Sequence, residues 1–211
     1  MAAKRFLIFL LSLPYLVMAL VAMKVRVKSV INDYEKCIEY ITGNPDKNKI
    51  IALSLIDVLR LAEDHRQLLH VGVDPIAILR TFYLRIFKKI NQGASTIDQQ
   101  LVRTITKRYE KTIRRKIREQ ILAVLIRKAS TPDEICRCYI SCCYYGYSTY
   151  GIDDLLKKKP NLSEFDIVAR VKYPFRRSSD PITEGKFRRR VFYLTYLYKT
   201  NKTRSAIFLR K

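Results

Sequence analysis

The chain has 211 residues, and its 41 lysines and arginines against 19 aspartates and glutamates give a formal net charge of +22. Apolar residues make up 48% of the chain, enough for a packed core, which excludes a chain that is disordered throughout. Only 6 residues are glycine, so a collagen-like chain is excluded too. So large a positive charge needs an anionic partner: a nucleic acid, an anionic membrane surface or a phosphorylated substrate.

The N-terminus carries an apolar segment of 18 consecutive uncharged residues, Phe6 to Met23. As a helix it would span roughly 27 Å, close to the thickness of a bilayer core. Basic residues bound it on both sides: Lys4, Arg5, Lys24, Arg26 and Lys28. A cleaved signal peptide is the alternative, because Ala19 and Ala22 are small residues near its end. We predict an uncleaved membrane anchor over residues 1–28, and the flanking charges alone do not set its orientation.

The rest of the chain, 29–211, is predicted to form one mostly helical domain. Apolar residues three or four positions apart predict helices over 30–40, 50–62, 75–89, 96–108 and 111–129. Thr131 followed by Pro132 predicts a further helix start, with the threonine as N-cap. No run of alternating apolar and polar residues predicts a long strand.

Five cysteines are present, at 37, 136, 138, 142 and 143. A zinc site would need two separated pairs at ligand spacing, often with histidine, and the two histidines lie far from the cysteine cluster in sequence. We therefore interpret the cysteines as small buried residues, and a disulfide remains an alternative outside the cytoplasm.

Three short passages hold polar residues beyond what ordinary helix ends require. The first, EDHRQLLHVG from Glu63, follows an apolar helix, and a capped, solvated helix end is its plain interpretation. The second, GASTIDQQ from Gly93, predicts a capping box, with Ser95 or Thr96 as the N-cap and Asp98 or Gln99 facing back. Capping does not explain the second glutamine.

The third passage is RKIRE from Arg115. On a helical wheel Ile113, Ile117, Ile121 and Val124 share one face, which we predict to be the core face. Glu119 then lies on the opposite face among lysines and arginines. This arrangement is either an exposed Arg115–Glu119 ion pair or a seat for a pyrophosphate with a carboxylate at its edge.

Together, these passages resemble the motifs of the peptidoglycan glycosyltransferases, glycosyltransferase family 51. The family pattern is Glu-Asp-x-x-Phe-x-x-His-x-Gly, then Gly-x-Ser-Thr-x-x-Gln-Gln, then Arg-Lys-x-x-Glu, and order and spacing both fit. The resemblance continues as YISCCYYGYSTYGI from Tyr139 and LSEFDIVARVKYP from Leu162, covering about residues 50–175 and weakly 188–194. Three positions and one short stretch depart from the family: Gln67 replaces phenylalanine, Asp98 replaces threonine, Ser141 replaces asparagine, and 153–155 replace a small-residue pair.

The resemblance implies a lysozyme-like, bilobal helical domain behind one transmembrane helix, with a smaller lobe, including the amphipathic stretch 82–90, that dips into the membrane. The implied substrates are lipid II and the growing glycan chain, joined by inverting transfer with release of undecaprenyl pyrophosphate. The implied catalytic residues are Glu63 as base and Glu119 beside the leaving group. The residues implied to bind substrate are Asp64, His70, Arg80, Ser95, Thr96, Gln99, Gln100, Arg103, Lys111, Arg115 and Lys116.

Further expectations follow from the resemblance. A divalent cation, magnesium or manganese, is expected near Glu119, and no organic cofactor. The expected location is the bacterial inner membrane, as a single-pass protein with its catalytic domain on the periplasmic side. Cell-wall synthesis proteins are expected partners, and nucleic acid is not. The 211 residues contain no Ser-x-x-Lys or Lys-Thr-Gly motif, so we expect no transpeptidase activity.

Three alternatives stay open. A membrane glycosyltransferase acting on a different polyprenyl-pyrophosphate glycan would keep Glu63 and the cations while changing positions that contact sugar, as at Asp98 and Ser141. A lysozyme-like hydrolase would use a carboxylate but needs neither the cations nor the anchor. A non-enzymatic binder of membranes or nucleic acid would explain the charge and leave the three spaced motifs to chance.

Overall fold

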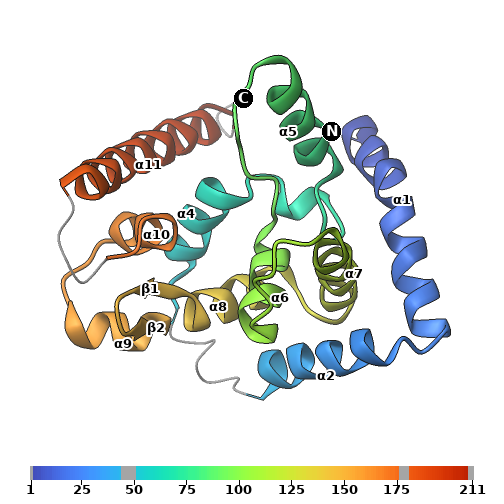
Figure 1. Cartoon of the computed structure of the whole chain (residues 1–211). Coiled ribbons are helices and arrows are strands. Elements are labelled where there is room, and N and C mark those ends of the chain that lie inside the picture. Colours follow the sequence, from blue (N-terminus) through green and yellow to red (C-terminus); the bar gives the residue numbers. More distant parts are fainter. Residues whose placement is uncertain (1, 44–50, 176–180, 209–211) are drawn as a thin grey trace.

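The computed structural model describes residues 2–43, 51–175 and 181–208, and most of these are helical (Figure 1). The α-helices are α1 (Ala2–Lys24), α2 (Lys28–Thr42), α4 (Leu53–Glu63), α5 (Pro75–Phe87), α6 (Ile97–Thr106), α7 (Ile113–Ala129), α8 (Pro132–Cys142), α9 (Gly151–Lys158), α10 (Glu164–Lys172) and α11 (Pro181–Phe208). A short 3-10 helix, η1 (Gln67–Leu69), lies between α4 and α5. The predicted helices are confirmed, with ends that differ by a few residues.

Side-chain caps fix where several helices begin. Thr131 caps α8 and exchanges hydrogen bonds with Glu134, a capping box that confirms the predicted helix start. Ser163 and Asp166 form the same arrangement at α10. Thr96 accepts a hydrogen bond from the Gln99 amide at the start of α6.

The centre of the molecule is a helical core in which α6 contacts both α7 and α8 (Figure 1). The buried side chains here include Leu101 of α6, Leu122 and Ile126 of α7, and Ile135 of α8. On one side of this centre α4 contacts α10 and α11, and on the other α1 and α2 contact α7. The C-terminal end of α4 and the N-terminal halves of α6 and α7 lie close together.

A small hairpin interrupts the helices. Its strands, β1 (Tyr144–Gly146) and β2 (Thr149–Tyr150), are antiparallel, and Tyr144 pairs with Tyr150. Gly146 also bridges to Phe175 and has a φ of 148°, and a Cβ there would lie 2.7 Å from the Phe175 carbonyl oxygen. Only glycine fits this approach. These strands have three and two residues, so the expectation of no long strand holds for the described part of the chain.

Helix α1 has the length and the apolar composition needed to cross a membrane. It contacts α5 and α7, and the side chains that it buries include Ile8, Ser12 and Ala19. Leu13 and Val17 are among its exposed apolar side chains. The helix therefore has one face against the domain and another free for lipid.

The predicted core face of α7 is wrong for the first half of the helix. Ile113 is 80% exposed and Ile117 is 42% exposed, whereas Glu119 is only 3% exposed. The helix enters the core from Leu122 onward, and Leu122 and Ala123 follow Glu119 by three and four residues, on the same face. The spacing of the isoleucines predicted the wrong buried face for this part of the helix. Glu119 can be buried there because its ion pairs with Arg115 and Lys116 compensate for the loss of water.

All five cysteines are free thiols, so the disulfide alternative is not observed. Cys37, Cys136, Cys138 and Cys143 are buried, as interpreted from the sequence. Burial raises the pKa of the Cys37 and Cys136 thiols to about 12. These thiols are therefore protonated at neutral pH and unreactive.

Candidate active site

Glu63 is the last residue of α4, and it lies at the edge of a cleft. Its side chain is 17% exposed. The Arg190 guanidinium of α11 donates to Glu63 Oε1 at 3.1 Å and to the Ala62 carbonyl at 2.8 Å. Gln100 Nε2 lies 3.5 Å from Glu63 Oε2. The carboxylate is therefore oriented from both sides while remaining accessible from the cleft.

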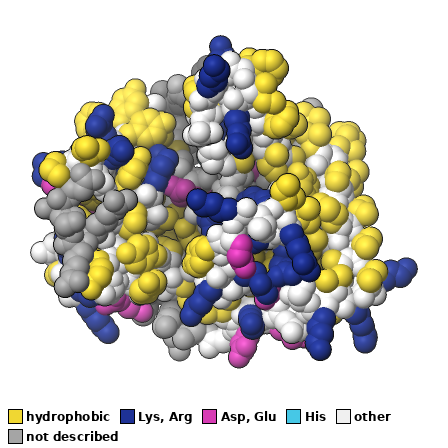
Figure 2. Space-filling model, viewed as in Figure 1, with side chains coloured by type: hydrophobic (Ala, Val, Ile, Leu, Met, Phe, Trp, Pro, Cys, Tyr) yellow, Lys and Arg dark blue, Asp and Glu magenta, His cyan; other side chains and the backbone are white. Residues whose placement is uncertain are grey.

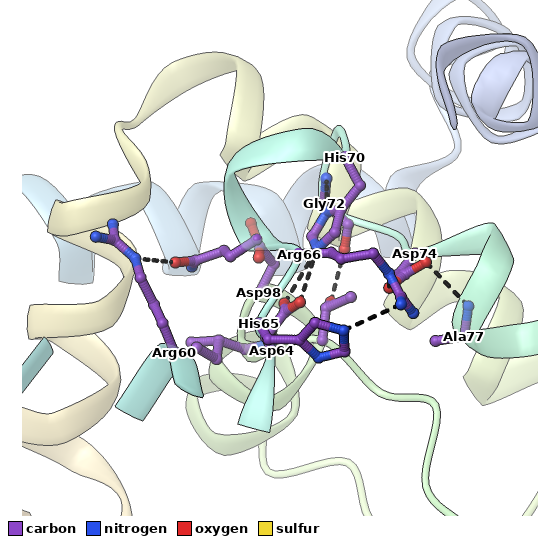
Figure 3. Close-up of polar contacts among 12 residues, drawn as sticks. Arg60, Asp64, His65, Arg66, His70, Gly72, Asp74, Ala77 and Asp98 are labelled. Carbon is purple, nitrogen blue, oxygen red and sulfur yellow. Dashed lines mark hydrogen bonds and ion pairs between the residues drawn. The ribbon is translucent and has the colours of Figure 1, made fainter. Parts of the chain in front are cut away.

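Behind Glu63, Asp64 and His70 are buried and bonded to each other (Figure 3). His70 Nδ1 accepts from the Gly72 amide at 3.1 Å, so its proton is on Nε2, which lies 3.0 Å from both Asp64 oxygens. Asp64 also accepts from the Ile97 amide at the first turn of α6. The pair thus ties the first motif to the second, and its role in binding substrate stays a prediction.

The turn between η1 and α5 is held by Asp74. Its Oδ1 caps α5 by accepting from the Ala77 amide, and its Oδ2 accepts from Arg66 at 2.8 Å (Figure 3). His65 lies beside Arg66, and burial, together with the charges of Arg66 and Arg80, lowers its pKa. Arg80 lines the same cleft as Glu63, and its role in binding substrate stays a prediction.

The two consecutive glutamines of α6 connect the two glutamates. Gln100 reaches Glu63, while the Gln99 side-chain oxygen accepts from Lys116 Nζ at 2.7 Å. Lys116 also donates to Glu119 Oε1 at 2.6 Å. Adjacent helical residues point about 100° apart, so one turn of α6 faces both sides of the site. This explains the second glutamine, which capping left unexplained.

The capping box predicted for α6 is only half present. Thr96 is the N-cap, and its hydroxyl donates to the Gly72 carbonyl at 2.7 Å. The Gln99 side chain turns to Lys116 and Asp98 turns to Arg127, so neither returns to the cap. Ser95 Oγ instead accepts from Lys116 at 3.0 Å. These side chains bond to charged partners and not to the N-cap, because hydrogen bonds to charged groups compensate more fully for the burial of polar atoms.

Glu119 lies at the centre of the cation group on α7. Arg115 Nη1 pairs with Glu119 Oε2, and Lys116 pairs with Oε1, so both carboxylate oxygens face cations. Burial lowers the pKa of Lys116, and the nearby Glu119 charge opposes that shift. Arg103 lines a small cavity next to Arg115 and Glu119, whereas Lys111 is exposed just before α7. Most of the predicted cations thus lie on α6 and α7 or just before α7, whereas Arg80 lines the separate cleft beside Glu63.

These contacts do not favour a metal at Glu119. Its two oxygens are already taken by Arg115 and Lys116, and the described residues contain no group of three acidic, histidine or cysteine side chains that could hold a metal ion. The divalent cation therefore stays a prediction.

Comparison with known proteins identifies the domain. The family model described as Transglycosylase matches residues 41–158, more than half of the chain. The chain belongs to the transglycosylase family. The matched segment contains all three motifs, together with Arg80, and the domain has the family's lysozyme-like, mostly helical fold.

Individual relatives agree with this assignment. Penicillin-binding protein 1A of Escherichia coli is 44% identical over 91 residues, 43% of this chain and 11% of the relative. The protein of the same name from Haemophilus influenzae is 40% identical over 109 residues, 51% of this chain and 13% of the relative. A protein of Cupriavidus necator named as a candidate transglycosylase is 38% identical over 92 residues, 44% of this chain and 40% of the relative. The matches thus span well under two thirds of each relative.

Two departures of this transglycosylase from the family pattern lie in one buried cluster around Arg127. Asp98 is fully buried and pairs with Arg127 at 3.2 Å, and Arg127 also donates to the Gln67 carbonyl at 2.9 Å. The Gln67 side chain accepts from Arg60 at 2.7 Å and from the Cys136 thiol at 3.1 Å. Both residues therefore face the interior of the protein.

Two residues that contact the site are not predicted by the sequence patterns. Arg190, which holds Glu63, lies in the weakly matching 188–194 segment, and the run of three arginines at 188–190 is the signal that points to it. Tyr139 donates its hydroxyl proton to Gln100 Oε1 at 2.6 Å. It begins the YISCC passage, which supports the resemblance without indicating a role for the tyrosine. Neither residue lies within the three motifs.

Proposed function

We propose that this protein is a membrane-anchored peptidoglycan glycosyltransferase that polymerises lipid II into glycan chains. The observation that carries the proposal is the link from Glu63 through Gln100 and Gln99 to Lys116 and Glu119. It sets a partly exposed carboxylate on one side of the site and a group of cations on the other. Family membership and the penicillin-binding relatives support the same reaction.

Glu63 accepts the proton of the attacking hydroxyl in this mechanism. The 4-hydroxyl of one N-acetylglucosamine attacks the anomeric carbon of the terminal sugar of the growing chain and inverts its configuration. The new glycosidic bond forms as the bond to the lipid pyrophosphate breaks. Glu63 suits the role of base because it is accessible and is oriented by Arg190 and Gln100.

The cations stabilise the departing pyrophosphate, which carries away the bonding electron pair. Arg115 and Lys116 are held by Glu119, and Arg103 adjoins them at the small cavity. Preorganised cations of this kind stabilise charge as it develops in the transition state. Glu119 therefore acts through its cations and does not exchange a proton with the substrate.

The surface supports a location against the bilayer (Figure 2). Several apolar side chains of α5 are exposed: Leu79, Phe82, Tyr83, Ile86 and Phe87. Figure 2 shows hydrophobic side chains along α1 and over α5, with basic ones at the centre of the same face. Contact between α1 and α5 places these apolar surfaces next to each other, as a lobe dipping into the membrane requires.

The catalytic domain is proposed to lie outside the cytoplasm, on the inner membrane of a bacterium, where proteins of cell-wall synthesis would be its partners. An alkaline phosphatase fused after Lys211, which needs an oxidising compartment, should be active, whereas a β-galactosidase fused at the same residue should be inactive. The reverse pattern would contradict this orientation.

Gln67 and Asp98 do not support the alternative of a different glycan substrate, because both are buried and bonded within the protein. The hydrolase alternative leaves the cations around Glu119 without a role, since water attack on a glycan releases no pyrophosphate.

The deciding experiment incubates the purified full chain with labelled lipid II, once with Mg²⁺ and once with EDTA. We expect a high-mass polymer that lysozyme digests and that Glu63→Gln does not form. Release of single disaccharides would favour hydrolysis instead, and an unchanged substrate would contradict the proposal. The EDTA arm tests the divalent cation separately.

A further inference from the structure

A buried carboxylate lies on the side of the α7 cations that faces α2. Asp33 of α2 is 3% exposed, and it precedes residues 41–158, the segment that matches the family. Burying a carboxylate is unfavourable unless cations or donors compensate for the lost water. Its partners therefore indicate why it is there.

Two arginines compensate the charge of Asp33. Arg108 donates from Nε to Oδ2 at 2.8 Å and from Nη2 to Oδ1 at 3.4 Å, a two-pronged contact. Arg118 of α7 places Nη1 3.7 Å from Oδ2, and its Nη2 donates to Ser29 Oγ of α2 at 2.9 Å. On its solvent side Arg108 also lies 4.0 Å from Glu110. One helix thus holds guanidinium groups from two other segments.

The same arginines border the site of the leaving group. Arg108 and Arg118 line the small cavity that Arg103, Arg115 and Glu119 also line. Glu119 holds Arg115 and Lys116, and Asp33 holds Arg108 and Arg118. Cations outnumber carboxylates here, so without fixed partners they would repel one another and spread apart.

We propose that Asp33 is a positioning residue for the cations that bind the pyrophosphate of the donor. By holding Arg108 and Arg118 toward α2, it keeps the cavity-lining guanidinium groups at a fixed spacing. The inference rests on the proposed function, which supplies the pyrophosphate as ligand. It makes α2, the helix that follows the candidate anchor, part of the donor site, although it lies almost wholly outside the matched segment.

The direction in which Asp33→Asn changes the affinity for an anion distinguishes a positioning role from a general electrostatic effect. Asp33→Asn removes a negative charge beside the cations, so electrostatics alone predicts tighter binding of an anion. Positioning predicts weaker binding, because the guanidinium groups lose their common partner. Glu35→Gln is a matched control, since Glu35 is exposed on the same helix and its substitution changes the charge by the same amount.

The test measures the Kd of farnesyl pyrophosphate, a short polyprenyl pyrophosphate, for the full chain in lipid nanodiscs. We expect Asp33→Asn to weaken binding by about tenfold or more, because small displacements of binding groups are costly. Glu35→Gln should stay within about twofold of the wild type. In the polymerisation assay Asp33→Asn should raise KM more than it lowers kcat, since Glu63 is untouched.

Because Asp33→Asn leaves Arg108 and Arg118 without their shared carboxylate, a second comparison guards against misfolding. Arg108→Gln is compared with the double variant Asp33→Asn, Arg108→Gln, so that only Arg118 loses a partner between the two. We expect the double variant to bind farnesyl pyrophosphate more weakly than the single one, despite its more positive charge. Equal or tighter binding in the folded Asp33 variants would overturn this inference alone. Failure of the wild type to bind the probe would overturn the proposed function as well.

Discussion

At the scale of single residues, the two glutamates of the site have different surroundings and therefore different chemistry. Glu63 is partly exposed, and its two hydrogen bonds to the protein, at 3.1 and 3.5 Å, leave room for a substrate proton. Glu119 is buried, and both of its oxygens face cations. Because both Glu119 oxygens are paired with cations, the proposed mechanism assigns the role of base to Glu63.

Glu63→Gln keeps the shape of the side chain but cannot accept a proton. We expect turnover to fall by at least about 10²-fold, the usual contribution of general-base catalysis, with little change in binding of the glycolipid inhibitor moenomycin. Polymerisation of labelled lipid II and moenomycin affinity measure the two effects separately. Near-normal polymerisation by this variant would contradict the assignment of Glu63.

Glu119→Gln should affect both activity and stability. The helical wheel places Glu119 on the face opposite the core, but the side chain is buried between Arg115 and Lys116. Removing its charge leaves two cations without their partner, which should lower the free energy of unfolding by about 1–3 kcal/mol. We expect a smaller loss of kcat than for Glu63→Gln, together with a raised KM. Thermal unfolding and polymerisation rates check both effects, and an unchanged melting temperature would contradict the buried ion pairs.

Asp98 gives the stability a pH dependence of its own. Burial raises its pKa from 3.8 to about 6, and the charge of Arg127 opposes the shift. The folded protein therefore binds this proton more tightly than the unfolded chain, so the contribution of Asp98 to stability falls as the pH rises from about 4 to about 6. The asparagine of Asp98→Asn does not titrate. The Tm of the wild type should therefore fall relative to that of the variant as the pH rises across this window, and the difference should then stay constant. A difference that is constant from pH 4 to pH 7 would contradict the raised pKa.

At the scale of elements, the start of α6 depends on a glycine in the preceding segment. Gly72 has a φ of 104°, and a Cβ there would lie 2.4 Å from the carbonyl oxygen of Ala123 in α7. The close approach lets the Gly72 carbonyl accept from Thr96, the N-cap of α6. The first motif thus presses against α7 while it holds α6.

Gly72→Ala should therefore destabilise the protein by about 1–3 kcal/mol, because it adds both a clash and a strained backbone conformation. Gly93→Ala is the control, since nothing lies within 4 Å of a Cβ built there. Melting temperatures of the two variants decide the matter. An equal change in both would show that the close approach at Gly72 is not limiting.

How far the elements could be predicted from the sequence depends on whether the signal was local. The start of α8 was predictable because Thr131, Pro132 and Glu134 form the cap within four residues. The core face of α7 was not, because the partners that bury Glu119 are settled by the contact of α6 with α7. The hairpin at 144–150 was missed for the same reason, since its strands are short and are completed by Phe175.

The site followed the same rule. The three motifs and their glutamates were identified by resemblance, and the structure brings them together through Gln99 and Gln100. Arg190 and Asp33 lie far from the motifs in sequence, and folding alone places them beside the glutamate and the cations. Contacts between segments so far apart in the chain leave no spacing that a single sequence reveals.

At the scale of the whole molecule, two properties favour binding to a membrane: the positive charge and the exposed apolar surface. The net charge of +22 attracts anionic lipid, and this attraction weakens as salt is added. Insertion of the exposed apolar side chains of α1 and α5 into lipid would be insensitive to salt, because it depends on apolar burial and not on charge. A protein bound only by charge would be released by salt, whereas an inserted helix would stay.

We therefore expect the full chain to remain with membranes after a wash in 1 M salt (about 3 Å Debye length) and after an alkaline wash. Leu13→Arg combined with Val17→Arg should release it, because both side chains lie on the exposed face of α1 and each arginine near the helix centre costs about 2.5–3.5 kcal/mol of insertion free energy. Leu53→Arg combined with Leu68→Arg makes the same chemical change at exposed positions outside α1 and should leave membrane retention unchanged.

The α1 double variant keeps Ile8, Ser12 and Ala19, which face the domain, so its release would identify the lipid-facing side of the helix as the anchor. Retention of that variant through both washes would instead assign the membrane attachment to another surface, such as that of α5, where Phe82 and Phe87 are exposed.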